Sequence, residues 1–304
     1  MPTVDLIIAV ASWEPRFLMG MRSILERYRT QRMLVYFLNE YRNVTSEPRR
    51  ELNHLAEAQR IDIETREIQF SSPSSTWRAL EADLASNRRP AERVLLDLTT
   101  MPREVIWSTL FWLESRNDQV RYVYHRPLEY GSDWLARDPS EPRLAYKLAG
   151  QLEPGRPTAL VLVTGFDADR CRQAVDFFEP SRLVLATQIG EQFDNAGRNV
   201  GPRFQQTSGA VEHVDVDAYA PDHGFAALHS SVRALSQEHN VVLCSFGPKP
   251  SALALYRLQR SHRHAALAFI GCREYNTAYS NGLGETLEGS FHWSGDPPST
   301  IKKC

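Results

Sequence analysis

The chain has 304 residues, of which 42% are hydrophobic and 24% charged, and its formal net charge at pH 7 is −2. This length predicts about two domains of ordinary size. The near-neutral charge argues against binding to nucleic acid or to membranes through a basic excess, so we expect no extended nucleic-acid surface.

The N-terminus and the cysteines favour a cytoplasmic protein. The first residues enter an apolar segment without a basic lead-in, which is untypical of a signal peptide. No apolar run approaches the roughly 20 residues that cross a bilayer, so we expect no membrane association. The four cysteines are widely spread and include no Cys-x-x-Cys pair. We therefore expect neither a metal site nor a disulfide framework.

In the first half of the chain, apolar runs alternate with segments of helical periodicity. Strands are predicted at residues 6–11, 33–38, 61–70, 94–98 and 120–125. Helices are predicted at residues 17–28, 48–59, 77–86 and 104–115. Strands that alternate with helices indicate a parallel sheet covered by helices on both faces.

The second half follows the same order less regularly. Strands are predicted at residues 160–164, 182–187, 211–216, 241–245 and 265–270. Helices are predicted at residues 169–178, 224–238 and 251–260. Residues 190–209, rich in Gly, Asn and Gln, are predicted to be a mobile loop or an irregular insertion. Residues 282–304 are predicted to be an irregular C-terminal tail, either an edge hairpin or a mobile end.

Two pairs of segments indicate that the halves are copies of one fold. DLIIAVASWE at residues 5–14 and ALVLVTGFD at residues 159–167 each run from an apolar strand into a small residue, an aromatic residue and an acid. VLLDLTTMPR at residues 94–103 corresponds at a similar offset to VVLCSFGPK at residues 241–249. We therefore expect an α/β protein with two Rossmann-like domains, mainly parallel sheets and an internal duplication. Proline-rich linker segments place the domains at residues 1–148 and 149–304.

The loops that follow strands are where a site is expected, because open parallel sheets bind ligands beyond the carboxyl ends of their strands. Polar loops of this kind stand at residues 12–16, 39–42, 97–104 and 245–249. Neither a Walker lysine loop nor a G-x-G-x-x-G loop is present, so no cofactor is predicted.

The loop at residues 97–104 combines an acid, two hydroxyl groups and a cation. Asp97 ends an apolar run, Thr99 and Thr100 follow, and Arg103 stands at the start of a predicted helix. Free backbone N–H groups at a helix N-terminus, together with hydroxyls and a cation, suit a phosphate. The alternative is that Thr99 or Thr100 only caps the helix, with Pro102 in its first turn. The two interpretations are compatible.

The other candidate ligand-binding residues are Ser12, Trp13, Gly165, Phe166, Ser245 and Lys249. Lys249 favours a functional loop in the second half, because a plain helix cap needs no cation. Trp13 and Phe166 are strand-end aromatics that suit stacking on bases, although a hydrophobic lid over the core is the more common role of such residues.

This arrangement resembles the CRISPR-associated Rossmann fold (CARF) domains, which sense cyclic oligonucleotides, usually across a two-fold dimer of such units. The resemblance is carried by residues 11–13 and 97–103, with residues 164–166 and 245–249 as a degenerate second set. The usual Thr-Gly-Gly-Thr-Lys type loop of the family is here Thr-Thr-Met-Pro-Arg, without glycines. We expect no nuclease or helix-turn-helix segment after the second half.

The resemblance implies a nucleotide-binding sensor or regulatory subunit in prokaryotic antiviral defence, with two CARF-like halves forming a pseudo-dimer. A cyclic oligonucleotide is the implied ligand, and a protein partner would carry the effector activity. Phosphates would meet Thr99, Thr100, Arg103 and Lys249, and bases would stack near Trp13 or Phe166.

Two alternatives remain open at the level of sequence. One is an enzyme that acts on a nucleotide or another phosphorylated metabolite, with Asp97 or Glu14 as general base and Arg103 steadying the developing charge. The other is a scaffold subunit of a larger complex, for which the degenerate second half is the best support.

Overall fold

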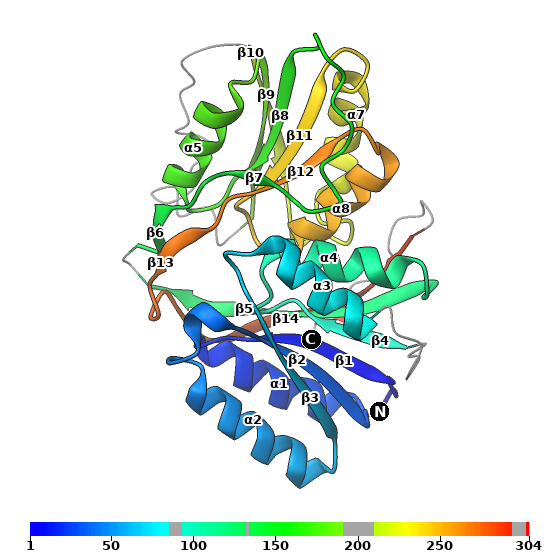
Figure 1. Ribbon diagram of the computed structural model, residues 1–304, viewed down its shortest axis with the longest axis vertical. Coiled ribbons are helices and arrows are strands. Elements are labelled where there is room, and N and C mark those ends of the chain that lie inside the picture. The colour runs from blue at the N-terminus through cyan, green and yellow to red at the C-terminus, as the bar shows by residue number, and fades with distance from the viewer. Residues whose placement is uncertain (85–92, 132–133, 191–209, 294–301, 304) are drawn as a thin grey trace. The chain divides into compact units, whose positions relative to one another are not determined.

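The computed structural model describes residues 1–84, 93–131, 134–190, 210–293 and 302–303, which divide into two compact units (Figure 1). The first unit contains Met1–Asp133 and Thr277–Cys304, and the second contains Trp134–Asn276. Each unit is built on a largely parallel sheet with helices on it. The predicted class, two Rossmann-like α/β domains, is confirmed.

The sheet of the first unit has the order β15-β14-β5-β4-β1-β2-β3. The five strands from β5 to β3 in this order are parallel, and β14 and β15 are antiparallel to their neighbours. Its strands are β1 (Leu6–Ala11), β2 (Arg32–Leu38), β3 (Asp62–Ile68), β4 (Val94–Asp97), β5 (Gln119–Tyr130), β14 (Ser280–His292) and β15 (Lys302–Lys303).

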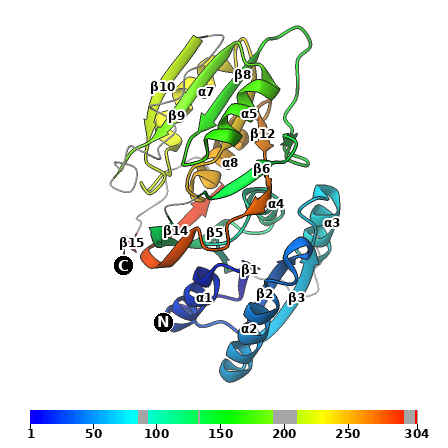
Figure 2. The ribbon, with the colours of Figure 1, turned by 90° about the vertical axis from the view of Figure 1, so that its left-hand side faces the viewer.

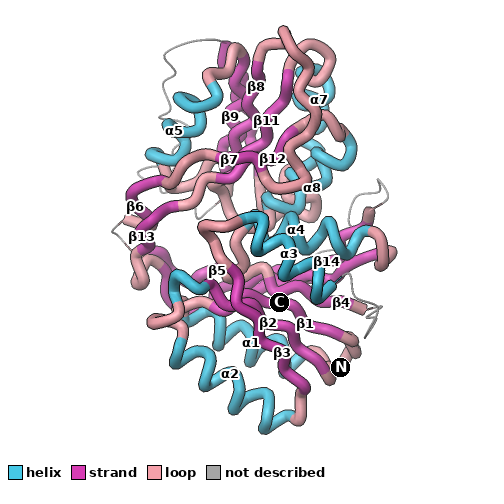
Figure 3. Tube along the Cα trace, in the orientation of Figure 1, coloured by secondary structure: helices cyan, strands magenta, loops and turns pink. Residues whose placement is uncertain are grey.

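Helices lie on both faces of this sheet (Figure 3). They are α1 (Pro15–Arg27), α2 (Ser46–Gln59), α3 (Pro73–Leu84) and α4 (Arg103–Glu114), with a short 3₁₀ helix η1 (Asn39–Tyr41) after β2. Ile7 and Ala9 of β1 share a core with α1 and α2. Because successive strand residues point to opposite faces, the equally buried Ile8 and Val10 face the side of α3 and α4. Burial on both faces explains the unbroken apolar run.

The second unit has the sheet order β10-β9-β8-β11-β12-β7, in which only β7 is antiparallel to its neighbour. Its strands are β7 (Arg143–Leu144), β8 (Thr158–Val163), β9 (Arg182–Gln188), β10 (Ala210–Val216), β11 (Asn240–Ser245) and β12 (Ala266–Phe269). The helix α5 (Ala168–Phe178) packs on one face, and α7 (Phe225–Leu235) and α8 (Ser251–Ser261) lie on the other (Figure 2). A separate pair joins β6 (Ala136–Pro139) to β13 (Cys272–Tyr275).

The two sheets share one topology, as an internal duplication requires. In each unit the five parallel strands stand in the order third, second, first, fourth and fifth, and an antiparallel strand flanks the fifth. That strand is β14 in the first unit and β7 in the second. The loops after the first and fourth strands are therefore neighbours in each unit, as in other doubly wound sheets.

The predicted boundary after residue 148 differs from the observed division. The tail predicted at residues 282–304 contributes most of β14 and all of β15, which pair antiparallel at the edge of the first sheet, as its edge-hairpin interpretation requires. The strand β14 also pairs with β5, from Ser280 opposite Tyr130 to His292 opposite Gln119. Local composition rich in Gly and Ser conceals a strand whose hydrogen-bonding partner lies far earlier in the chain. In addition, β6 and β7 occupy a segment predicted as linker and belong to the second unit. Residues 85–86, 191–209 and 294–301 of the predicted elements lie outside the described residues.

Candidate functional site

The carboxyl ends of β1 and β4 lie side by side and bring two predicted loops together. Ile8 of β1 pairs with Leu96 of β4. Beyond this pair, the hydroxyl group of Thr100 donates a hydrogen bond to the carbonyl oxygen of Val10, at 2.6 Å. The loop after β4 is thereby tied to the end of β1.

Asp97 and Thr99 are buried in this edge of the sheet, with 1% and 0% of their surface exposed. The Thr99 N–H donates to Asp97 Oδ1 at 2.9 Å. The Thr99 hydroxyl oxygen accepts a hydrogen bond from the His125 N–H at 3.1 Å and lies 3.1 Å from the ring Nδ1 of His125. Burial, with the positive charges of Arg27 and Arg16, lowers the pKa of His125 to about 4. The ring is therefore neutral near pH 7.

The capping interpretation of these threonines is wrong. The helix α4 begins at Arg103 with Pro102 at the N-cap position, and no side chain caps it. The hydroxyls of Thr99 and Thr100 instead bond to His125 and to Val10. Arg103, the first residue of α4, is half-buried, whereas Thr99 and Thr100 are buried.

Glu14 lies in the loop after β1 and is 5% exposed. Its Oε2 accepts hydrogen bonds from Arg16 Nε at 3.1 Å and from Ser280 Oγ at 3.0 Å, and its Oε1 accepts one from the Tyr279 hydroxyl. Burial alone would lower the pKa of Arg16, but the adjacent carboxylate and the nearby hydroxyls of Tyr279, Tyr124 and Tyr130 together outweigh it and raise that pKa. These contacts hold the Glu14 carboxylate inside the unit.

Ser12 and Trp13 complete the loop after β1. The Ser12 hydroxyl oxygen accepts a hydrogen bond from the Glu14 N–H at 3.2 Å, and Ser12 is buried. Trp13 is half-buried and lies against Tyr41 of η1, with ring centroids 4.5 Å apart and planes inclined at 53°. The aromatic pair thus extends from the loop after β1 to the loop after β2.

The predicted residues of the second unit lie at its corresponding edge. A Cβ atom on Gly165 would stand 2.4 Å from the carbonyl oxygen of Phe246, so only glycine allows the loops after β8 and β11 to approach this closely. Ser245 is buried, with its hydroxyl 2.6 Å from that of Ser251. Phe166 and Lys249 are half-buried.

A buried arginine in the first turn of the first helix binds a carbonyl oxygen in, or directly after, the fifth strand of each unit. Arg16 Nη1 donates to the carbonyl oxygen of His125 at 2.9 Å, and Arg170 Nη1 donates to that of Ile270 at 3.3 Å. These carbonyls occupy equivalent positions in the two units. In each unit, the last paired residue of the fourth strand has a partner in the fifth strand, and the carbonyl belongs to the residue two places after that partner.

Each of these arginines also has a buried acid beside it. Arg170 Nε donates to Asp167 Oδ2 at 2.8 Å, as Arg16 does to Glu14. Sequence reasoning missed the pair, although the signal was present: an arginine follows the acid by two residues in the first half and by three in the second. The repeat of one interaction at one place supports the internal duplication.

Other functional classes find little basis in the described part of the chain. No group of three or more His, Cys, Asp or Glu side chains there could hold a metal ion. Cys244 is fully buried in β11. Within the same residues, no helix is both long and apolar enough to cross a bilayer.

No protein-family model and no curated protein matches this sequence. Among solved structures, the chain is similar to a type III CRISPR defence DNA nuclease activated by cyclic oligoadenylate. The TM-score is 0.54 and the identity 13%, over 83% of this chain and 63% of that one. The chain has a CARF-like fold. This likeness confirms the fold predicted from the strand-end loops.

Two further structures resemble the chain more distantly. Can2 from Sulfobacillus thermosulfidooxidans in complex with cyclic tetra-adenylate matches with a TM-score of 0.31 and 13% identity, over 39% of this chain and 31% of that chain. The cytoplasmic domain of a prokaryotic cation chloride cotransporter matches with a TM-score of 0.31 and 12% identity, over 92% of this chain and 98% of that chain. The chain thus spans less than two thirds of the length of Can2 and of the nuclease.

Proposed function

We propose that this CARF-like chain is a nucleotide-binding sensor or regulatory subunit whose ligand is a cyclic oligonucleotide. The observation that carries the proposal is the adjacency of the loops after the first and fourth strands in both units. This adjacency occurs in a fold shared with a nuclease that cyclic oligoadenylate activates. The proposal places the chain in the prokaryotic cytoplasm, in antiviral defence, with a partner protein that carries the effector activity.

Under this proposal we assign the candidate residues two roles, according to their burial. Arg103 and Lys249 are half-buried cations at the starts of α4 and α8, suited to ligand phosphates. Trp13 and Phe166 are half-buried aromatics suited to stacking on bases.

The remaining candidates shape the loops from within. They are Ser12, Asp97, Thr99, Thr100, Gly165 and Ser245. The polar side chains among them bond inside each unit, and Gly165 lets two loops approach closely. We therefore assign them the role of holding the loop backbone, and we assign ligand contact to the half-buried residues Arg103, Lys249, Trp13 and Phe166. The enzyme alternative draws no support from this geometry, since Asp97 and Glu14 are both buried and hydrogen-bonded.

A thermal-shift titration of the full chain with cyclic and linear oligoadenylates tests the proposal. Binding raises the melting temperature by mass action. In Arg103→Ala we expect about tenfold weaker binding, the size of one lost charge-assisted hydrogen bond. Trp13→Ala should weaken it similarly, by about 1–3 kcal/mol for one base stack.

Arg78→Ala is the matched control, because Arg78 is an exposed arginine on α3. The Arg78→Ala variant should bind oligoadenylates as tightly as the unaltered chain does. The absence of a shift with every oligoadenylate, or equal losses in Arg103→Ala and Arg78→Ala, would refute the proposal.

A further inference from the structure

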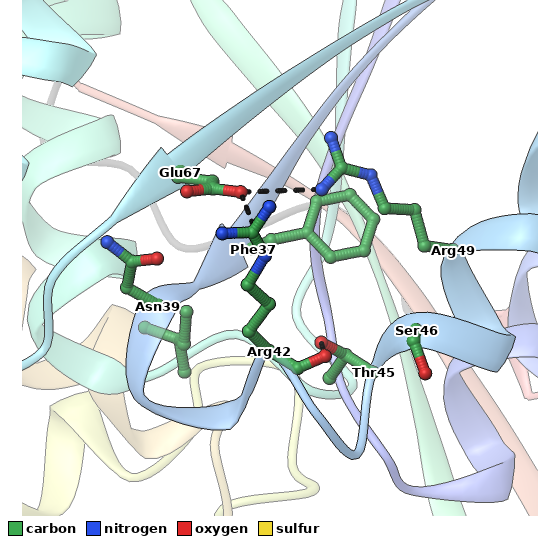
Figure 4. A pocket seen from close by; sticks show the side chains of 8 residues that line it. Phe37, Asn39, Arg42, Thr45, Ser46, Arg49 and Glu67 are labelled. Carbon is green, nitrogen blue, oxygen red and sulfur yellow. Dashed lines mark hydrogen bonds and ion pairs between the residues drawn. The ribbon is translucent and has the colours of Figure 1, made fainter.

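A pocket lies at the carboxyl end of β2, in a polar loop that the proposed function leaves unused (Figure 4). Its volume is about 140 Å³, enough for several water molecules or one tetrahedral oxyanion. Its apolar wall comes from Phe37 and Leu38 at the end of β2. Its polar lining comes from Asn39, Arg42, Thr45, Ser46, Arg49 and Glu67.

Two arginines in this pocket share a single carboxylate oxygen. Arg42 Nε lies 3.9 Å and Arg49 Nη1 3.4 Å from the same Oε1 of Glu67, as the dashed lines in Figure 4 mark. These three side chains together carry one excess positive charge. Both contacts are long, and the Arg42 side chain is 72% exposed. Ion pairs of this kind contribute little to stability, so the guanidinium groups can turn to a better acceptor at small cost.

Arg49 is held in position by contacts on two sides. Its guanidinium carbon lies 4.8 Å from the centre of the Phe37 ring, and its Nη2 donates to Thr65 Oγ1 at 3.3 Å. A guanidinium placed over an aromatic ring loses less side-chain freedom when it binds an anion. Arg49 therefore supplies a fixed cation and Arg42 a second one that approaches from η1.

The start of α2 adds partial positive charge to the same pocket. Thr45, the N-cap residue, makes no side-chain cap, because its hydroxyl donates backwards to the carbonyl oxygen of Tyr41 at 2.9 Å. Backbone N–H groups in an uncapped first turn favour anions. This contribution supplements the arginine pair, on which the inference depends.

We propose that this pocket binds a phosphate group, either as free phosphate or as the monoester of a small metabolite. One guanidinium comes from Arg42, directly after η1, and the other from Arg49 on α2, whose N-terminus faces the same pocket. Donors in several directions match a tetrahedral dianion better than a planar carboxylate. The site is distinct from the one proposed above: it uses the loop after β2, and a cyclic oligonucleotide contains only phosphodiesters.

Isothermal titration of the full chain with inorganic phosphate, at constant ionic strength, tests this assignment. Arg42→Ala and Arg49→Ala should each bind phosphate about tenfold more weakly, as expected for one hydrogen bond to a charged group. Arg50→Ala is the matched control, since Arg50 is exposed, stands next to Arg49 on α2 and does not line the pocket. The Arg50→Ala variant should bind phosphate as tightly as the unaltered chain does.

The Glu67→Gln substitution should change the affinity for phosphate in the opposite direction. Removing the carboxylate that competes for both arginines should tighten phosphate binding several-fold, a gain that misfolding cannot produce. Titration with adenosine 5′-monophosphate separates the two sources: tighter binding than phosphate assigns a monoester, and equal or weaker binding assigns free phosphate.

Three results would overturn the assignment: no saturable phosphate binding at millimolar concentrations, equal losses in Arg42→Ala and Arg50→Ala, or weaker binding in Glu67→Gln. None of these bears on cyclic ligands, whose binding is tested with Arg103→Ala. Failure of one proposal is therefore distinguishable from failure of the other.

Discussion

The Thr99 hydroxyl oxygen accepts a hydrogen bond from the backbone N–H of His125 and also lies within hydrogen-bonding distance of its ring, both at 3.1 Å. This contact fixes the loop after β4 to the neighbouring strand β5. The loop at residues 97–104, which combines an acid, two hydroxyl groups and a cation, is therefore held from inside by Thr99, while Arg103 is only half-buried.

Replacing this hydroxyl should destabilise the first unit. Thr99→Val keeps the shape of the side chain but leaves the backbone N–H of His125 without its acceptor in a buried site. We expect a loss of about 1–3 kcal/mol in the free energy of unfolding, measured by urea denaturation. Thr3→Val, at an exposed threonine, should change it by no more than about 0.5 kcal/mol. Equal effects of the two substitutions would contradict the role given to Thr99.

Acidification should destabilise the protein through two buried histidines. Burial lowers the pKa of both His125 and His223 to about 4, below the value of 6.5 expected when unfolded. Between these values the unfolded chain binds more protons, so stability is full above pH 6.5 and falls as the pH drops towards 4. Each histidine should cost about 2 kcal/mol between pH 7 and pH 5.

The measurement is urea denaturation at pH 7 and pH 5 for the unaltered chain and for His125→Asn. The variant should lose less stability on acidification, because one of the two histidines no longer titrates. If the pH dependence of the variant matches that of the unaltered chain, His125 does not contribute in the way its burial implies.

The close approach of two loops in the second unit makes Gly165 intolerant of a side chain. In Gly165→Ala the new Cβ would meet the backbone oxygen of Phe246 at 2.4 Å, and we expect a cost of about 1–3 kcal/mol or more from overpacking. Gly155→Ala is a suitable comparison: its φ is +84°, but nothing lies within 4 Å of a Cβ there, so the cost should stay near 1 kcal/mol. The free energy of unfolding of both variants is measured by chemical denaturation. Equal losses in the two variants would show that the loops can separate freely.

The buried pair of Glu14 and Arg16 should behave differently from an exposed pair. Glu14→Gln leaves a buried arginine without its carboxylate and should cost about 3–5 kcal/mol of unfolding free energy. Glu51→Gln removes the partner of Arg22 in a pair whose side chains are 43% and 56% exposed, and should cost at most about 1 kcal/mol. A double variant, Glu14→Leu with Arg16→Met, should cost less than Glu14→Gln alone. If the double variant loses as much stability as the two single substitutions added together, Glu14 and Arg16 are not a coupled pair.

The alternation of strands and helices could be predicted from the sequence because it depends on local pattern. All six residues of β1 are buried, and an unbroken apolar run is what a strand covered on both faces requires. The predicted ranges agree with β1, β2, β4, β9 and β11 to within one or two residues. The strand-end loops were found for the same reason, since they begin where each apolar run stops.

The sequence by itself thus determined the two α/β halves, their repeat and the loops in which a site was sought. Only the tertiary structure decided that β14 completes the first sheet, that Thr99 and Thr100 bond inward, and that Arg42 and Arg49 share Glu67. Each of these depends on a partner from another element, and β14 lies far from β5 along the chain. Such contacts form because buried backbone and side-chain polar groups need hydrogen-bond partners once the strands have become neighbours. The periodicity of a single segment contains no information about those partners.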